Sequence, residues 1–303
     1  MPSARPSSQH FVLGALLVFA SALTWSFGGS LARSLTVTDS WTIVFWRSLF
    51  AAAFLIGFMV ARDGAAGTVA LFRGMGVPGV SVGLCFAIAS MAFIVALTHT
   101  TVANILLIQA GVPLIAALMA WAFFRETPQT ATWIAIAAVI AGIAIMVSDS
   151  LGGAGSLIGN ALALLIAVSF ASATVITRRF SHVRMMPACC FGTLVAVAVA
   201  SQLAGSFAIS TADVIILIAF GAFNLGLGMA FFVTGVRLIP ASIAALIGAS
   251  EPVLGPFWVW LTHGETPSVQ TVIGGAVVLV ALVAHILWQI RRQRQETGLS
   301  QAV

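Results

Sequence analysis

The chain has 303 residues, of which 60% are hydrophobic and only 7% charged, whereas a soluble globular protein carries about 25% charged residues. Its 13 basic and 8 acidic residues give a net charge of +5. This composition excludes an ordinary soluble domain. Repeated apolar stretches of about 20 residues, the length that crosses a bilayer as a helix, predict an all-α integral membrane protein.

Ten transmembrane helices are expected, separated by short segments that leave no room for a soluble domain. Turn residues such as Thr38-Asp39-Ser40 and Gly152-Gly153-Ala154-Gly155 set their limits. Residues 1–10 form an N-terminal tail and residues 291–303 a C-terminal tail. In chain order the expected helices cover residues 11–32, 41–61, 77–98, 101–122, 131–148, 158–178, 187–205, 213–237, 241–262 and 269–290.

The arginines indicate an orientation for this helix bundle. Ten helices place both termini on one side of the membrane. If that side is the cytoplasm, eleven arginines fall in cytoplasmic segments, Arg33 falls outside, and Arg47 lies within the second helix. Cytoplasmic loops of membrane proteins are enriched in basic residues, so we expect both termini to be cytoplasmic.

A tetrapeptide occurs twice at a spacing of 139 residues, as RETP at 125–128 and GETP at 264–267. At the same spacing Pro113 aligns with Pro252. The chain therefore divides into two repeats, residues 11–150 and 151–290, of five helices each. Because five is odd, the second repeat enters the membrane from the opposite side, and the sequence predicts an inverted repeat of the kind that many transporters use.

These features together resemble the EamA-type members of the drug/metabolite transporter superfamily. The resemblance rests on the two five-helix repeats with their Glu-Thr-Pro loops, on the pair Arg178-Arg179, and on Glu251-Pro252. Within the superfamily the chain is similar to the YddG-type amino-acid exporters. The resemblance implies a bacterial inner membrane and alternating access to a central cavity lined mainly by helices 1–4 and 6–9.

The resemblance also implies that helices 5 and 10 are peripheral. Their sequences agree, because residues 131–148 and 269–290 are apolar through the middle, as suits helices that face lipid. Such apolar faces permit a homodimer without requiring one.

Two charged residues lie within expected helices, where a charge is costly and often functional. Glu251 could bind a substrate ammonium or a proton, or could instead satisfy the backbone that Pro252 disrupts. Arg47 could bind a substrate carboxylate through its planar fork. Alternatively, Arg47 reaches the interface or pairs internally with Glu251.

Further candidates for the cavity are polar, aromatic or sulfur-containing residues at membrane depth. Amides can bond a zwitterion or bond across helices as packing contacts, and aromatic and methionine side chains at helical spacing are commonly simple packing. The candidates are Trp25, Trp46, Met91, Phe93, Asn104, Gln109, Asn224, Met229 and Phe231. Hinge candidates, which could equally be static kinks, are Pro113, Gly226, Gly228, Pro252 and Pro256.

No pattern in the sequence indicates an enzyme, a metal site, a cofactor or a nucleic-acid partner. The three cysteines lie in apolar runs, and no protease, lipase or nucleotide-binding motif occurs. The sequence therefore favours an inner-membrane exporter of small metabolites, with an amino acid and the lipid bilayer as its partners. Export of another metabolite or of a drug-like cation is the alternative. A lipid-modifying enzyme and a non-transporting scaffold are more remote.

Overall fold

The computed structural model describes residues 8–300 except 126–127, 152–155, 181–182, 237 and 240. Within these ranges the chain is helical and contains no strand. Eight helices are long and apolar enough to cross a membrane. A ninth is added if the pair α5 (Val102–Gln109) and α6 (Val112–Phe124), bent by 42°, counts as one span. The predicted all-α, multi-pass architecture is confirmed, while a total of ten spans stays a prediction.

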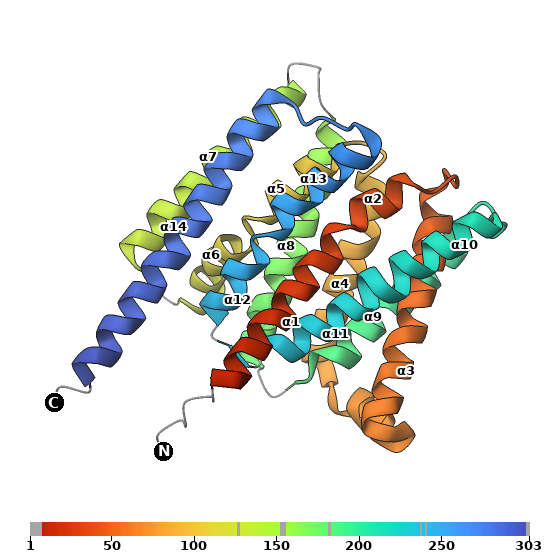
Figure 1. Ribbon diagram of the computed structural model, residues 1–303, viewed down its shortest axis with the longest axis horizontal. Helices are drawn as coiled ribbons and strands as arrows, with labels where there is room; N and C mark the ends of the chain where they lie inside the picture. The colour runs from red at the N-terminus through yellow and green to blue at the C-terminus, as the bar shows by residue number, and fades with distance from the viewer. Residues whose placement is uncertain are drawn as a thin grey trace.

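The helices follow one another along the chain with short connections (Figure 1). In the first half they are α1 (Ser8–Ser26), α2 (Gly28–Arg33), α3 (Ser40–Gly74), α4 (Gly76–Ala96), α5, α6 and α7 (Thr130–Leu151). In the second half they are α8 (Leu157–Arg179), α9 (Met185–Leu203), α10 (Thr211–Ile218), the π-helix η1 (Ala219–Leu227), α11 (Gly228–Gly235), α12 (Ala241–Gly248), α13 (Glu251–His263) and α14 (Val269–Ser300).

The structure adds helical segments after two predicted helix ends. The predicted end near residue 61 corresponds to a break at Gly64, where φ is 73° and ψ is 168°, but a second helical segment follows and α3 as a whole reaches Gly74. Leu71 and Phe72, expected in a loop, lie in that second segment and pack on the buried cluster around Leu55, where burial of their apolar side chains stabilises it. Helix α14 continues past residue 290 to Ser300, because its arginine, glutamine and glutamate residues all favour helix.

Helices α7 and α14 lie side by side along one edge of the bundle (Figure 1). Glycines allow their backbones to approach closely. A Cβ atom added to Gly142 would lie 2.7 Å from the carbonyl oxygen of Gly274, and one added to Gly274 would lie 3.0 Å from the backbone nitrogen of Met146. The later part of α7 therefore faces the beginning of α14, and the two helices are antiparallel.

The sequence repeat corresponds to a repeat of local structure. Helices α12, α13 and α14 each begin 139 residues after α5, α6 and α7 respectively. Helices α6 and α13 also end alike, because Arg125 (φ 55°) and Gly264 (φ 66°) are both left-handed and donate their N–H groups to Trp121 and Trp260. This is a common way of ending a helix. Among the described residues, Arg125 alone adopts a positive φ without being glycine.

Asp39 fixes the beginning of α3 and attaches it to the segment after α9. Its carboxylate accepts hydrogen bonds from the N–H groups of Trp41 (3.3 Å), Thr42 (3.0 Å) and Gly205 (3.3 Å). The Thr42 hydroxyl lies 2.5 Å from Asp39 Oδ2 and 2.5 Å from the carbonyl oxygen of Ser206. Burial alone would raise the pKa of Asp39, but these hydrogen bonds outweigh it and hold the pKa below its usual value.

The lowered pKa of Asp39 predicts how stability depends on pH. A carboxyl group whose folded pKa is depressed stabilises the fold above its unfolded pKa of about 3.9, and the effect is lost as the pH falls through the folded value. We expect Asp39→Asn to lower the unfolding temperature in detergent at neutral pH, with the difference from wild type shrinking below about pH 4. Thermal unfolding at several pH values measures this, and a difference that is constant with pH would contradict the assignment.

Candidate substrate site

Arg47 lies in the interior of the bundle, where aromatic rings surround it. Its side chain is only 6% exposed. Nη1 donates a hydrogen bond to the hydroxyl of Ser90 on α4 (3.0 Å). The guanidinium carbon lies 4.4 Å from the ring centre of Phe220 on η1 and 5.8 Å from that of Phe93 on α4. A desolvated cation over an aromatic ring gains about 2 kcal/mol, so these rings partly offset the cost of burying the charge.

The structure gives this charge no anionic partner. Within the described part of the chain no ion pair involves Arg47, and the proposed internal pair with Glu251 is not observed. Asp213 on α10 is occupied by the N–H (2.8 Å) and hydroxyl (2.5 Å) of Thr36 and by the hydroxyl of Ser210 (3.0 Å). Asp39 is occupied by the bonds that cap α3. Among the described residues, Arg47 is therefore a buried cation without a counter-ion.

The π-helix η1 connects Arg47 with the end of α1. Asn224 Nδ2 donates hydrogen bonds to the carbonyl oxygens of Thr24 (2.6 Å) and Trp25 (3.3 Å) in the last turn of α1. A Cβ atom added to Gly226 would lie 2.7 Å from the ring of Phe54 on α3. π-Helical turns are rare and frequently mark functional sites. One irregular segment thus contacts α1, which carries Trp25, and α3, which carries Trp46 and Arg47.

Helix α13 packs on the short interruption between α1 and α2. The Ser26 hydroxyl accepts a hydrogen bond from Trp258 Nε1 (3.0 Å) and donates one to the carbonyl oxygen of Leu23 (2.7 Å). Phe27, at the interruption itself, stacks on Trp258 with ring centres 4.8 Å apart. The tryptophan of α13 therefore reinforces the point at which the first helix is interrupted.

Glu251 begins α13, directly after the break from α12. Its side chain is partly exposed, and it makes no hydrogen bond or ion pair with any residue that the structure describes. Gln109 ends α5, and its Nε2 is buried without a hydrogen-bond partner. A carboxylate in the first turn of a helix is favoured by the helix dipole. Glu251 therefore lies at a helix N-terminus, with a carboxylate that no described residue bonds.

The predicted hinge residues lie close to these irregular points. Pro113 and Pro252 each follow a break, at residues 110–111 and 249–250. Pro256 lies inside α13, Gly226 inside η1, and Gly228 at the start of α11. A Cβ atom added to Gly228 would lie 2.6 Å from the indole ring of Trp25. Gly228 is thus needed for close packing against α1, whatever its part in bending.

The remaining candidates are held in contacts between helices. Asn104 donates to Thr100 Oγ1 (3.0 Å) and to the side-chain oxygen of Asn160 on α8. Met229 Sδ lies 3.6 Å from Cys189 Sγ, and Trp46 Nε1 donates to the carbonyl oxygen of Phe207 (3.2 Å). Met91 and Phe231 are partly buried. No hydrogen bond joins any of these residues to Arg47.

Sequence reasoning missed a polar cluster at the end of the bundle that carries Arg33. Arg33 Nε contacts Glu265 Oε2 at 2.9 Å, Nη1 donates to the carbonyl oxygen of Leu97 (2.8 Å), and Nη2 donates to that of Thr100 (3.2 Å). Glu265 Oε1 accepts the N–H of Val102 at the start of α5 (2.7 Å). The Glu-Thr-Pro loop that contains Glu265 gives no sign of this pairing in the sequence, although the isolated Arg33 is a signal that this end of the bundle needs an acid.

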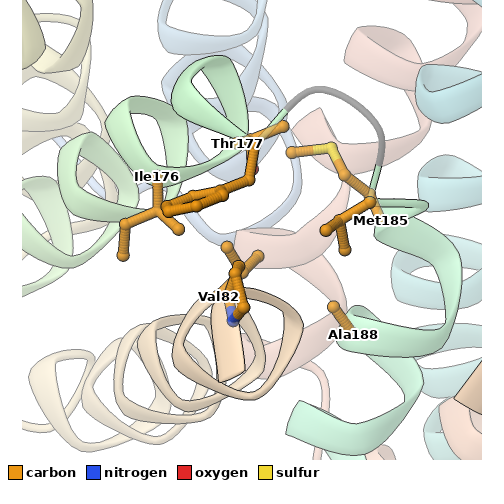
Figure 2. Close-up of a pocket in the computed structure, with 8 residues that line it drawn as sticks. Val82, Ile176, Thr177, Met185 and Ala188 are labelled. Atoms are coloured by element: carbon orange, nitrogen blue, oxygen red, sulfur yellow. The ribbon is translucent and has the colours of Figure 1, made fainter. Parts of the chain in front are cut away.

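The structure also contains a small apolar hollow between α4, α8 and α9. Figure 2 shows Val82, Ile176, Thr177, Met185 and Ala188 around it. Pro78, Phe180 and Val183 complete the lining. The hydroxyl of Thr177 is its only polar side-chain group, and that oxygen is buried without a partner. The hollow therefore offers no charged group and is separate from the Arg47 cluster.

Comparison with known proteins places this arrangement among transporters. The model of the EamA-like transporter family matches residues 12–148 and 157–287. The pseudopaline exporter CntI of Pseudomonas aeruginosa (strain UCBPP-PA14) is 28% identical over 278 residues, which cover 89% of this chain and 95% of the exporter. One solved crystal structure aligns with a TM-score of 0.64 at 20% identity, over 92% of this chain and 98% of its own; this likeness shows a shared fold.

The Arg33–Glu265 pair predicts a measurable coupling energy. Both side chains are largely shielded, at 31% and 18% exposure, and hydrogen bonds to charged groups contribute about 1.5–3 kcal/mol. A double-mutant cycle with Arg33→Gln and Glu265→Gln, measured by unfolding in detergent, should give a coupling free energy of at least about 1 kcal/mol. The more exposed pair Arg62–Asp63 (3.2 Å) serves as the control, for which we expect about 0.2–1 kcal/mol. Equal couplings in the two cycles would contradict a special role for Arg33.

Proposed function

We propose, since the chain belongs to the EamA-like transporter family, that it exports aromatic and neutral amino acids across the bacterial inner membrane. The family and the exporter relative indicate a transporter rather than an enzyme. Within the family we place the chain with the YddG-type amino-acid exporters. The observation that carries the proposal is Glu251, an unpaired carboxylate at the break between α12 and α13, which suits the ammonium group of an amino acid.

We further propose that two inverted repeats, residues 11–150 and 151–290, build ten spans with both termini in the cytoplasm. The family model matches each half once. Helix α12 with α13 would supply the tenth span, as α5 with α6 supplies its counterpart in the first half. The antiparallel contact between α7 and α14 supports the inversion, because equivalent helices of inverted repeats run in opposite directions.

Alternating access would use the breaks between helices as hinges. The structure interrupts its helices at Phe27, at 110–111 and at 249–250. At the Arg33 end, the Arg33–Glu265 pair and the Thr36–Asp213 bonds tie separate helices together. Opening toward that side requires these bonds to break, while the hinge residues Pro113, Pro252 and Pro256 bend or rotate the segments beside them.

A second candidate function follows from the pseudopaline exporter, which is similar over nearly the whole chain. In this version the substrate is pseudopaline or another metabolite of that kind. A drug-like cation remains the third version, since Glu251 alone would also bind a cation. Substrate competition distinguishes the three. A homodimer through the lipid-facing sides of α7 and α14 is compatible with each of them.

The amino-acid version is tested by flux. Purified protein in liposomes should transport labelled methionine, threonine and tryptophan above protein-free vesicles, because these substrates carry the ammonium group that Glu251 can bind. Unlabelled amino acids, pseudopaline and a lipophilic drug cation are then added as competitors. Absence of flux for all three amino acids would exclude this version, and competition by pseudopaline alone would favour the second candidate.

Glu251 is tested in the same vesicles with and without an imposed pH gradient. We expect Glu251→Gln to lower amino-acid flux at least tenfold, which corresponds to about 1.4 kcal/mol, because the amide cannot balance a substrate ammonium. Asp63→Asn is the control, since Asp63 pairs with Arg62 and Arg184 away from the breaks. If the gradient leaves wild-type flux unchanged, Glu251 binds substrate without coupling transport to protons. Unchanged flux in Glu251→Gln would remove it from the site.

A further inference from the structure

The guanidinium group of Arg47 has hydrogen-bonding capacity that the protein does not use. An arginine carries five N–H donors. One nitrogen of Arg47 bonds Ser90, and Nε is buried with no partner at all. We propose that Arg47, with Ser90 and the rings of Phe93 and Phe220, is the carboxylate-binding subsite of the transporter, so that its substrates must bear a carboxylate. This inference rests on the proposed transport function and specifies the substrate class.

The cost of burying the charge of Arg47 indicates that the guanidinium has an anionic partner at some stage of the transport cycle. A buried arginine within a membrane helix is costly. The contact with Phe220 offsets part of that cost, but a single hydrogen bond to Ser90 leaves the planar fork mostly unsatisfied. A carboxylate fits that fork with two parallel hydrogen bonds. A bound carboxylate therefore accepts the N–H donors of Arg47 that the folded protein leaves without acceptors.

No carboxylate of the described residues contacts Arg47. Asp39, which caps α3, and Asp213 on the adjoining α10 are each held by several hydrogen bonds from neighbouring residues. Glu265 bonds Arg33 and Val102, and Asp63 pairs with Arg62 and Arg184. Glu251 is unpaired, but it makes no ion pair with Arg47 either. In a transporter the substrate is the molecule that enters the interior, so a substrate carboxylate is the counter-ion that we assign to Arg47.

The surroundings of Arg47 favour a carboxylate over a simple inorganic anion. Ser90 accepts the arginine bond, so its own hydroxyl hydrogen can donate to one carboxylate oxygen. Phe93 and Phe220 provide an apolar wall beside the charge, which suits the carbon skeleton that a carboxylate carries. Because the guanidinium is covered in this structure, the ligand reaches it only when η1 and α4 separate from α3.

The experiment compares an acid with its amide. Purified full-length protein in detergent is heated with L-methionine or L-methioninamide, and the unfolding midpoint is followed by tryptophan fluorescence. The two ligands share the ammonium group and side chain and differ at the carboxylate. We expect L-methionine to bind wild type at least tenfold more tightly than the amide. Arg47→Gln should lose this preference, and Arg62→Gln, which removes a surface arginine, should keep it.

Further measurements distinguish failure of the carboxylate subsite from failure of the amino-acid proposal. A panel of other carboxylates, such as succinate, is tested against wild type and Arg47→Gln. If amino acids show neither flux nor binding, but another carboxylate stabilises wild type and not Arg47→Gln, the subsite stands and the amino-acid substrate is wrong. If no carboxylate stabilises wild type, or if the amide binds as well as the acid, the subsite is refuted.

A purely structural role for Arg47 makes a different prediction. Arg47→Gln would then lower stability without changing the ratio of acid to amide affinity. If Arg47→Gln does not fold, Ser90→Ala and Arg47→Lys provide the same readout, because the first removes one donor beside the carboxylate and the second keeps the charge but loses the fork. Each should reduce the preference several-fold. An unchanged preference in both variants would overturn the proposal.

Discussion

Inside a membrane, a broken helix must find hydrogen bonds for its freed backbone groups within the protein, because no water is present to supply them. This requirement shapes the centre of the molecule. Asn224 bonds the carbonyl oxygens at the end of α1, and the Ser26 hydroxyl bonds that of Leu23. Ser250 does the same for Ile247 at the end of α12. The breaks after α1 and α12 are thus each accompanied by a small polar side chain, so polar residues beside the candidate site also maintain its irregular backbone.

Much of the architecture could be predicted because membrane helices follow few rules. A span needs a certain apolar length, and proline or glycine shows where it is interrupted. These rules located the long apolar helices that the structure describes and the interruptions beside Pro113 and Pro252. They failed for residues 65–74, where Leu71 and Phe72 gain burial that no local pattern reveals. The π-helix η1 was equally hidden, since a widened turn depends on what packs against it.

The candidate site was predictable only in part, because depth in the membrane identifies a polar residue but not its partners. Arg47 and Glu251 were singled out for being charged within apolar stretches, yet their separation depends on how α3 and α13 pack. Asn104 is a candidate because it is polar at membrane depth, and in the structure it bonds Asn160. Glu265 escaped notice because its partner Arg33 is 232 residues away in sequence. Long-range pairing of this kind leaves no periodic signal in a single sequence.

The common spacing of 139 residues between α5–α7 and α12–α14 also limits how such a chain can vary in length over evolution. One residue inserted within a helix turns everything after it by about 100° around the helix axis. An insertion within α7 before Gly142 would therefore rotate Gly142 away from Gly274, and the large side chains on either side would separate the two backbones. Relatives of different length should carry their extra residues in connections between helices and not within α7 or α14.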